Sequence, residues 1–286
     1  MKLLLMSLVL VAGSAQAAVA APGVRAAPVP IERIIWLKAD ASKTNPTLSY
    51  IAGKLPQIRH EYLSANSIRS WQMIQRGEPV CRALTVRTAA RESEAYFTDQ
   101  MLAAPAELLM RKSKLDLAPR NKANEVDLAA LLSQGQLQGA VSRGRSYGEH
   151  IDQLVSQYVG SKQLADYATA GYGERLQDML TRGRTDYLID SGAALAQMRQ
   201  RQLATDDLIR LPIQGATQPL VISIACPRTP WGLAAIQAID EVLGTPEAAA
   251  HLRKAAGEWG GQQSLEQIKP LIEQFYARRS KPQFGR

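Results

Sequence analysis

Residues 31–86 read IERIIWLKADASKTNPTLSYIAGKLPQIRHEYLSANSIRSWQMIQRGEPVCRALTV, a stretch in which apolar runs alternate with helix signals. The apolar runs are typical of buried strands and lie at 31–39, 60–65 and 80–86. One helix is predicted from Asn45-Pro46 to Lys54, and a second, capped by Ser67, ends before Gly77. Because strands that alternate with helices usually pair in parallel, the stretch predicts an α/β unit built on a parallel sheet.

The remainder of the chain continues the alternation and predicts a second α/β unit. Further strands are predicted at 107–111, 137–142, 185–189, 208–213 and 220–226. Further helices are predicted after Gly144 and at 126–133, 173–182, 193–203, 231–243, 246–256 and 264–278. The helix after Gly144 has apolar residues at the i, i+3, i+4 and i+7 spacing of a stripe that faces a core.

The first twenty residues, MKLLLMSLVLVAGSAQAAVA, have the pattern of a secretory signal peptide. Lys2 supplies the positive end, an apolar run follows, and small residues precede a cleavage site near Ala17 or Ala20. Residues 21–30 are rich in alanine and proline and are predicted to be a linker. No later segment reaches the roughly 18 consecutive apolar residues of a membrane helix. We therefore expect a periplasmic protein without a membrane anchor.

The formal net charge is +8, and the basic residues are scattered along the chain. A diffuse positive field favours acidic ligands, although a solvated basic surface gives the same composition. Because no basic stripe is interleaved with aromatic residues, we do not expect nucleic acid as a partner. The three histidines, His60, His150 and His251, lack the paired spacing that holds zinc. We expect no metal, no cofactor and no enzymatic activity.

The sequence contains two cysteines, Cys81 in the strand run 80–86 and Cys226 at the end of 220–226. In an exported protein an even number of cysteines favours a disulfide, and the alternative is two buried free thiols. A disulfide between them would return the C-terminal part of the chain to the first α/β unit. That unit would then be discontinuous in sequence.

Three short segments carry groups suited to binding a small acid or zwitterion: Thr88-Ala-Ala-Arg91, Gly144-Arg-Ser146-Tyr-Gly148 and Gly183-Arg-Thr-Asp-Tyr-Leu-Ile-Asp190. Arg91 follows a strand end, where open α/β sheets bind ligands, and a guanidinium pairs bidentately with a carboxylate. Gly144 and Ser146 lie between a strand and a helix, and the N-terminus of a helix favours an anion. Asp190 ends a strand and offers a carboxylate to an ammonium group.

Each of these residues also has an alternative structural role. Arg91 is suited to a surface ion pair with Glu92 or Glu94. Ser146 and Glu149 have the spacing of a capping box. Asp190 is suited to cap the alanine-rich helix that follows it.

Together the segments resemble the motifs of the periplasmic solute-binding proteins of family 3. The family's Thr-x-x-Arg motif is similar to Thr88 to Arg91, followed here by Phe97-Thr98-Asp99. Its Gly with Ser or Thr at a helix start is similar to Gly144 to Ser146, and its Gly-Arg-x-Asp-Ala-x-x-x-Asp strand is similar to 183–190. An aromatic-Pro-Pro-aromatic loop of the family is replaced by Ala39-Asp40-Ala41-Ser42, and its Pro after the Phe-Ser motif by Gln100-Met101. The chain is therefore similar to a divergent branch of this family.

The resemblance implies the two-lobed type II periplasmic binding fold, in which each lobe is a mostly parallel sheet flanked by helices. Two hinge crossings are expected near 105–112 and 212–222. The implied division is a first lobe at 31–107 and 215–280, a second lobe at 108–214 and a C-terminal tail at 281–286.

The resemblance also implies a function and a site. Arg91, in the motif that Thr88 begins, would hold the ligand's carboxylate together with the Gly144 amide and the Ser146 hydroxyl, and Asp190 would bind an ammonium. The protein would capture a small polar solute, an amino acid or organic acid, for a membrane permease of an ABC transporter or for a sensor.

Two alternative functions remain open at the level of sequence. One is a lyase-type enzyme on the same scaffold, with Glu149, Glu174 or His150 as the acid or base. The other is a regulatory interaction module without a ligand, which the missing aromatic loop favours.

Overall fold

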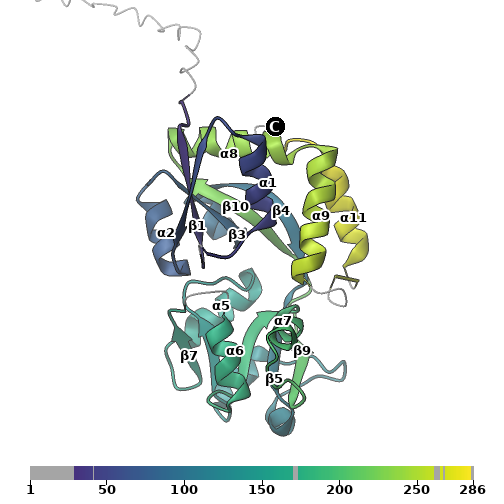
Figure 1. The fold of residues 1–286 in the computed structure, drawn as a ribbon. Helices are drawn as coiled ribbons and strands as arrows, with labels where there is room; N and C mark the ends of the chain where they lie inside the picture. Colours follow the sequence, from purple (N-terminus) through teal and green to yellow (C-terminus); the bar gives the residue numbers. More distant parts are fainter. Residues whose placement is uncertain (1–28, 41, 170–172, 261–264, 267, 285–286) are drawn as a thin grey trace, which may run out of the picture.

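The structure is a computed structural model that describes residues 29–284 apart from 41, 170–172, 261–264 and 267. The predicted signal peptide and most of the predicted linker lie outside the described residues. The described chain forms two lobes, one above the other in Figure 1, and each is built on a five-stranded sheet flanked by helices. This is the two-lobed α/β architecture that the sequence predicts.

The first lobe contains a sheet of order β2-β1-β3-β10-β4. Its strands are β1 (Arg33–Lys38), β2 (Arg59–Ser64), β3 (Val80–Val86), β4 (Ala95–Ala103) and β10 (Leu220–Pro227). Its helices are α1 (Pro46–Lys54), α2 (Ser67–Gln75), α3 (Ala89–Glu92), α8 (Pro230–Leu243), α9 (Pro246–Gly260) and α11 (Lys269–Arg279). β1 pairs in parallel with β2 and β3, whereas β10 is antiparallel to both of its neighbours.

The second lobe repeats this plan with the order β7-β6-β8-β5-β9. Its strands are β5 (Ala106–Arg111), β6 (Gly139–Ser142), β7 (Leu164–Tyr167), β8 (Tyr187–Ser191) and β9 (Leu208–Pro212). Its helical segments are η1 (Lys112–Leu117), α4 (Leu128–Gln134), α5 (Glu149–Tyr158), α6 (Glu174–Thr181) and α7 (Ala194–Gln200). Here β5 is the antiparallel strand.

The antiparallel strand of each sheet is the one by which the chain arrives from the other lobe. The chain crosses from β4 to β5 at 104–105 and returns from β9 to β10 at 213–219. The predicted boundary at 107/108 falls inside β5, because the chain has already joined the second sheet at Ala106.

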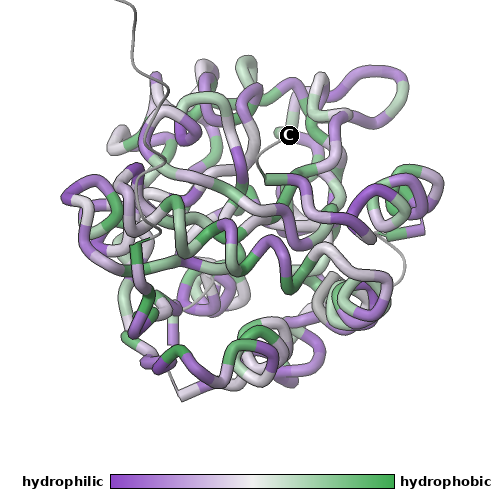
Figure 2. The backbone as a smooth tube through the Cα atoms, turned by 90° about the horizontal axis from the view of Figure 1, so that it is seen from above, coloured by the Kyte–Doolittle hydropathy of each residue, from purple (hydrophilic) through white to green (hydrophobic). Residues whose placement is uncertain are grey.

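Helix starts follow the local sequence. The Asn45 side chain accepts a hydrogen bond from the Leu48 N–H, and Pro46 occupies the first position of α1, where a missing N–H costs nothing. At α2 the cap is Asn66, whose side chain accepts from the Arg69 N–H, so the prediction of Ser67 as the cap is wrong by one residue. Hydrophobic and hydrophilic positions alternate within the helices (Figure 2), as expected where one face covers a sheet.

The core of the first lobe lies on both faces of its sheet. Trp36 is fully buried with Leu48 and Ile236 on one face, and Leu37 packs with Ile74 on the other. Cys81 of β3 and Cys226 of β10 form a disulfide between adjacent strands, with their Cα atoms 4.4 Å apart. The pairing predicted from the two cysteines is therefore present in the structure.

Candidate functional site

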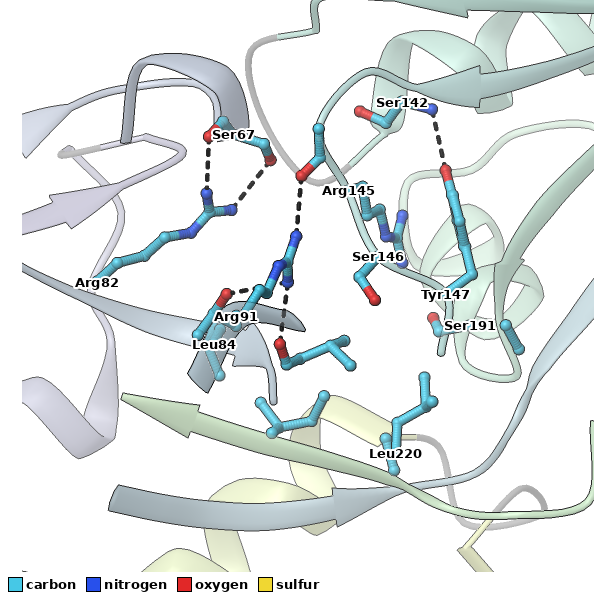
Figure 3. A pocket seen from close by; sticks show the side chains of 16 residues that line it. Ser67, Arg82, Leu84, Arg91, Ser142, Arg145, Ser146, Tyr147, Ser191 and Leu220 are labelled. Atoms are coloured by element: carbon cyan, nitrogen blue, oxygen red, sulfur yellow. Dashed lines mark hydrogen bonds between the residues drawn. The ribbon is translucent and has the colours of Figure 1, made fainter. Parts of the chain in front are cut away.

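A cavity of about 60 Å³ lies between the lobes, where two of the three predicted segments meet. The polar residues that line it include Ser67, Arg82, Thr85 and Arg91 from the first lobe and Ser142, Arg145, Ser146, Tyr147 and Ser191 from the second, most of which are labelled in Figure 3. Ala106 and Leu220, which stand at the two hinge crossings, also line it. The cavity is thus bounded by both lobes and by the hinge.

Arg91 reaches this cavity because of the turn that follows β3. Thr88 caps α3 by accepting the Arg91 N–H at 3.3 Å, which starts the short helix immediately beyond the sheet edge. The Arg91 guanidinium donates through Nη1 to the Val86 carbonyl at 2.9 Å and through Nη2 to the Gly144 carbonyl of the other lobe at 3.1 Å. It also lies 4.9 Å from the centre of the Trp71 ring. The surface pair with Glu92 does not form, since Glu92 binds Arg87.

The Arg91 guanidinium is incompletely satisfied by the protein. Its five N–H groups meet three acceptors, the third being the Thr85 hydroxyl at 3.5 Å. Among the described residues none accepts from the Nε–H or from the second N–H of Nη2. Burial lowers the pKa of Arg91, and the nearby carboxylates of Asp152 and Glu94 only partly oppose this. An anion in the cavity would supply the missing acceptors and charge.

Ser146 lies in a turn, three residues before α5. Its hydroxyl donates to the Asp152 carboxylate and accepts from the Gly148 N–H at 3.3 Å. Gly148, with φ of 98°, is the residue before the first turn of α5, so the predicted capping box is not formed. The Glu149 carboxylate instead accepts from the Ala89 N–H of the first lobe at 2.9 Å.

Gly144 lies close to the first lobe. Its φ is +74°, and a Cβ there would lie 3.3 Å from the Ile68 backbone nitrogen. A side chain at this position is therefore disfavoured by both conformation and space. The Gly144 carbonyl is consequently available to Arg91, which ties the two lobes together.

Asp190 is satisfied by its own chain. Its Oδ1 lies 2.8 Å from Nη2 of Arg145 and accepts from the Ser191 N–H at 2.7 Å, while Gln177 donates to Oδ2 at 3.1 Å. The Asp190 side chain is 6% exposed. It does not cap α7, whose first-turn cap position is Ala193.

Arg82, Arg145 and Tyr147 line the cavity and are not among the site residues predicted from the sequence. Arg145 packs over the Tyr147 ring at 5.3 Å. Burial acts to lower the pKa of Arg145, but the charge of Asp190, its hydrogen bond to Arg145 and the nearby Tyr147 and Glu174 together outweigh burial and raise it. Burial raises the pKa of Tyr147 to about 12, and its oxygen accepts from the Ser142 N–H. The only signal in the sequence was the position of Arg145 and Tyr147 on either side of Ser146.

Two neighbouring cavities complete the cleft. One of about 280 Å³ is lined by Lys38 and Asp40 of the first lobe and by Glu174 and Gln177 of the second, and Leu84 lines both it and the smaller cavity. The other, about 320 Å³, lies on the hinge side and contains Thr88. The structure thus brings Arg91, Gly144 and Ser146 together in one cavity, with Thr88 beside it and Asp190 behind Arg145.

The described residues include no group of three or more His, Cys, Asp or Glu side chains arranged to hold a metal ion. No helix in the described part of the chain is long and apolar enough to cross a bilayer.

Several solved structures of binding proteins share this architecture. An ancestral arginine-binding protein bound to arginine matches with a TM-score of 0.59 and 17% identity, over 82% of this chain and 100% of that one. The chain has the two-lobed fold of the family 3 periplasmic binding proteins. The arginine-, lysine-, histidine-binding protein ArtJ from Geobacillus stearothermophilus matches with a TM-score of 0.59 and 11% identity, over 83% of this chain and 99% of that one.

A sensor domain also shares the fold. A histidine kinase sensor domain with similarity to periplasmic binding proteins matches with a TM-score of 0.58 and 14% identity, over 80% of this chain and 95% of that one. No model of a protein family matches the sequence, and neither does any curated protein. The likeness to these structures therefore concerns the fold.

Proposed function

We propose that this protein is an exported solute-binding protein that closes its two lobes over a small carboxylate-bearing ligand. The observation that carries the proposal is Arg91, a half-buried guanidinium in the interlobe cavity with two N–H groups that no described residue accepts. Two free N–H donors on one guanidinium suit a carboxylate, which accepts more than one hydrogen bond. Neighbours of the same fold that bind amino acids support this reading.

The contacts between the lobes suit reversible closure. Arg91 to Gly144, Ala89 to Glu149, and Lys43 to Glu174 at 3.2 Å each join the lobes through an exposed or half-exposed polar contact. Such contacts contribute little individually, so a ligand that bridges both lobes would shift the population toward the closed form.

The partner would be a membrane permease or a membrane sensor, and the periplasm is the proposed compartment. The signal-peptide pattern of residues 1–20 and a disulfide between Cys81 and Cys226 both support export to an oxidising compartment. Both amino acid transporter components and a kinase sensor domain occur among the neighbours, which supports either partner.

Calorimetric titration with L-amino acids and small organic acids tests the proposal. We expect at least one carboxylate to bind, and Arg91→Ala to weaken that binding by about tenfold or more, because charge-assisted hydrogen bonds contribute about 1.5–3 kcal/mol. Arg278→Ala, an exposed arginine on α11, is the matched control and should bind like the wild type. The proposal fails if no panel member binds or if Arg91→Ala binds as well as the control.

A second candidate is a regulatory module that carries no ligand. Two observations favour it: the cavity at Arg91 measures about 60 Å³, below the roughly 300–1,000 Å³ of ordinary ligand pockets, and the lobes bind each other directly. Absence of binding across the whole panel, with the protein folded, would favour this candidate.

We propose no catalytic role. Glu149 binds Ala89, Glu174 binds Lys43, and His150 Nε2 contacts the Gln214 carbonyl at 3.0 Å, and none of the three lines the cavity at Arg91. Residues 144–148 also have the Gly-x-Ser-x-Gly spacing of a nucleophile elbow. Ser146, however, donates its hydroxyl hydrogen to Asp152 and has no histidine partner among the described residues.

A further inference from the structure

The lining of the cavity at Arg91 is one-sided in charge. Figure 3 shows Arg82, Arg91 and Arg145 around it, and none of the described residues that line it is an aspartate or a glutamate. All three arginines are half-buried, so solvent screens them less than it screens surface charges. A cavity of this kind favours an anion and disfavours any ammonium group that enters it.

Asp190, the carboxylate with which a ligand's ammonium would pair, already has a cation from its own chain. Arg145 holds it at 2.8 Å, and the Asp190 side chain is almost fully buried. Separating this pair to admit an external ammonium would leave a buried charge without its partner, which is strongly unfavourable. Arg145 therefore stands where a ligand's amino group would otherwise bind.

The geometry of an α-amino acid sharpens this point. Its ammonium and carboxylate are attached to the same carbon atom, so a carboxylate held by Arg91 brings the ammonium into the same cavity. There the ammonium would meet Arg82 and Arg145 instead of an acid. A ligand that carries a second carboxylate in place of the ammonium would meet a second guanidinium.

We propose that the ligand is a compact dicarboxylate or similar organic acid without an α-amino group, bound by Arg91 together with Arg82 and Arg145. This inference rests on the proposed function and names the ligand class of the same site. The small volume of the cavity, about 60 Å³, limits the acid to a short carbon skeleton.

Matched ligand pairs test the inference on the wild-type protein. Calorimetry compares succinate with L-aspartate and glutarate with L-glutamate, which differ only in the α-amino group, and butyrate serves as the acid with one carboxylate. We expect each dicarboxylate to bind about tenfold or more tightly than its amino acid, and succinate more tightly than butyrate. Equal or tighter binding of the amino acids overturns the inference.

Two variants report on the internal ion pair. Arg145→Gln removes the internal cation. The affinity for succinate should therefore fall by about tenfold, and the preference between succinate and L-aspartate should shift toward L-aspartate. Asp190→Asn should leave succinate binding unchanged or tighter, and circular dichroism confirms that each variant is folded. Arg278→Gln is the charge-matched control.

The outcomes separate this inference from the function on which it rests. If amino acids bind, depend on Arg91 and are lost in Asp190→Asn, the solute-binding function stands and the ligand class is wrong. If neither acids nor amino acids bind, or if Arg91→Ala leaves the affinity unchanged, the solute-binding function itself is overturned, and the inference fails with it.

Discussion

Glu149 joins the two lobes through a single side chain. Its Oε1 accepts from the N–H of Ala89, the first residue of α3, at 2.9 Å. A carboxylate at a helix start is favourable because the N–H groups there are unpaired. The contact is exposed, so it contributes less than a buried charge-assisted bond.

We expect Glu149→Ala to shift the protein toward the open form. Loss of an exposed contact of about 0.5–1 kcal/mol changes the open-to-closed ratio about two- to fivefold. Small-angle X-ray scattering without ligand should show a larger radius of gyration, and Glu149→Gln, which retains an acceptor, should show less change. Glu258→Ala, an exposed carboxylate on α9, is the control. An unchanged radius in Glu149→Ala would contradict this role.

At the residue scale, the sequence predicted which residues lie at the site better than it predicted which side chains pair with each other there. Arg91, Gly144 and Ser146 come together because their motifs follow strand ends that meet at one cleft. The pairing of Asp190 with Arg145 depends on how the turn at 143–148 folds back, which no spacing rule specifies. A motif therefore predicts where a residue lies more reliably than it predicts the partner of its side chain.

At the scale of elements, α8 packs unusually closely on the end of β10. The Thr229 side chain caps the helix by accepting the Gly232 N–H at 3.0 Å. A Cβ on Gly232 would lie 1.9 Å from the Pro227 carbonyl oxygen, which is backbone and cannot rotate away. The first turn of α8 thus needs a glycine because there is no space for a side chain, and not because of its backbone conformation.

Gly232→Ala is therefore expected to destabilise the fold by about 1–3 kcal/mol or more, as overpacked sites do. Gly257→Ala is the matched comparison, since a Cβ there meets nothing within 4 Å and alanine favours the helix by about 0.5–1 kcal/mol. Unfolding in urea should show a midpoint below that of the wild type for Gly232→Ala and above it for Gly257→Ala. Similar midpoints in both would show that α8 can shift away from β10.

Strands that are apolar runs were predicted, whereas β4, which has polar residues at its centre, was missed. β1, β3 and β10 were predicted because they are apolar runs. β4 was missed because Thr98, Asp99 and Gln100 interrupt its apolar residues. Thr98, for example, is buried and donates its hydroxyl hydrogen to Asp240 at 2.6 Å, and such a partner comes from a segment far along the chain.

At the scale of the whole molecule, the second lobe is an insertion into the first. The chain leaves the first sheet after β4 and returns as β10, which pairs with both β3 and β4. The alternation of strands and helices predicted the two α/β units, but the crossings had to be inferred from the family resemblance. Composition alone does not reveal them, because a crossing strand is as apolar as any other.

The disulfide between Cys81 and Cys226 spans a sequence separation of 145 residues that includes the whole second lobe. In the chain-entropy model, closure of so long a loop stabilises the protein by about 5 kcal/mol. We expect the double variant Cys81→Ser/Cys226→Ser to unfold at clearly lower urea concentration than the wild type. Dithiothreitol should lower the midpoint of the wild type and leave that of the variant unchanged; equal sensitivity in both would contradict the assignment.

The same covalent link determines how the molecule comes apart when it is cut. A protease that cleaves one peptide bond anywhere between Cys81 and Cys226, for instance in an exposed loop of the second lobe, produces two fragments that remain joined. Such a nicked molecule would migrate as an intact chain on a denaturing gel without reductant and separate into two bands only when a thiol is added.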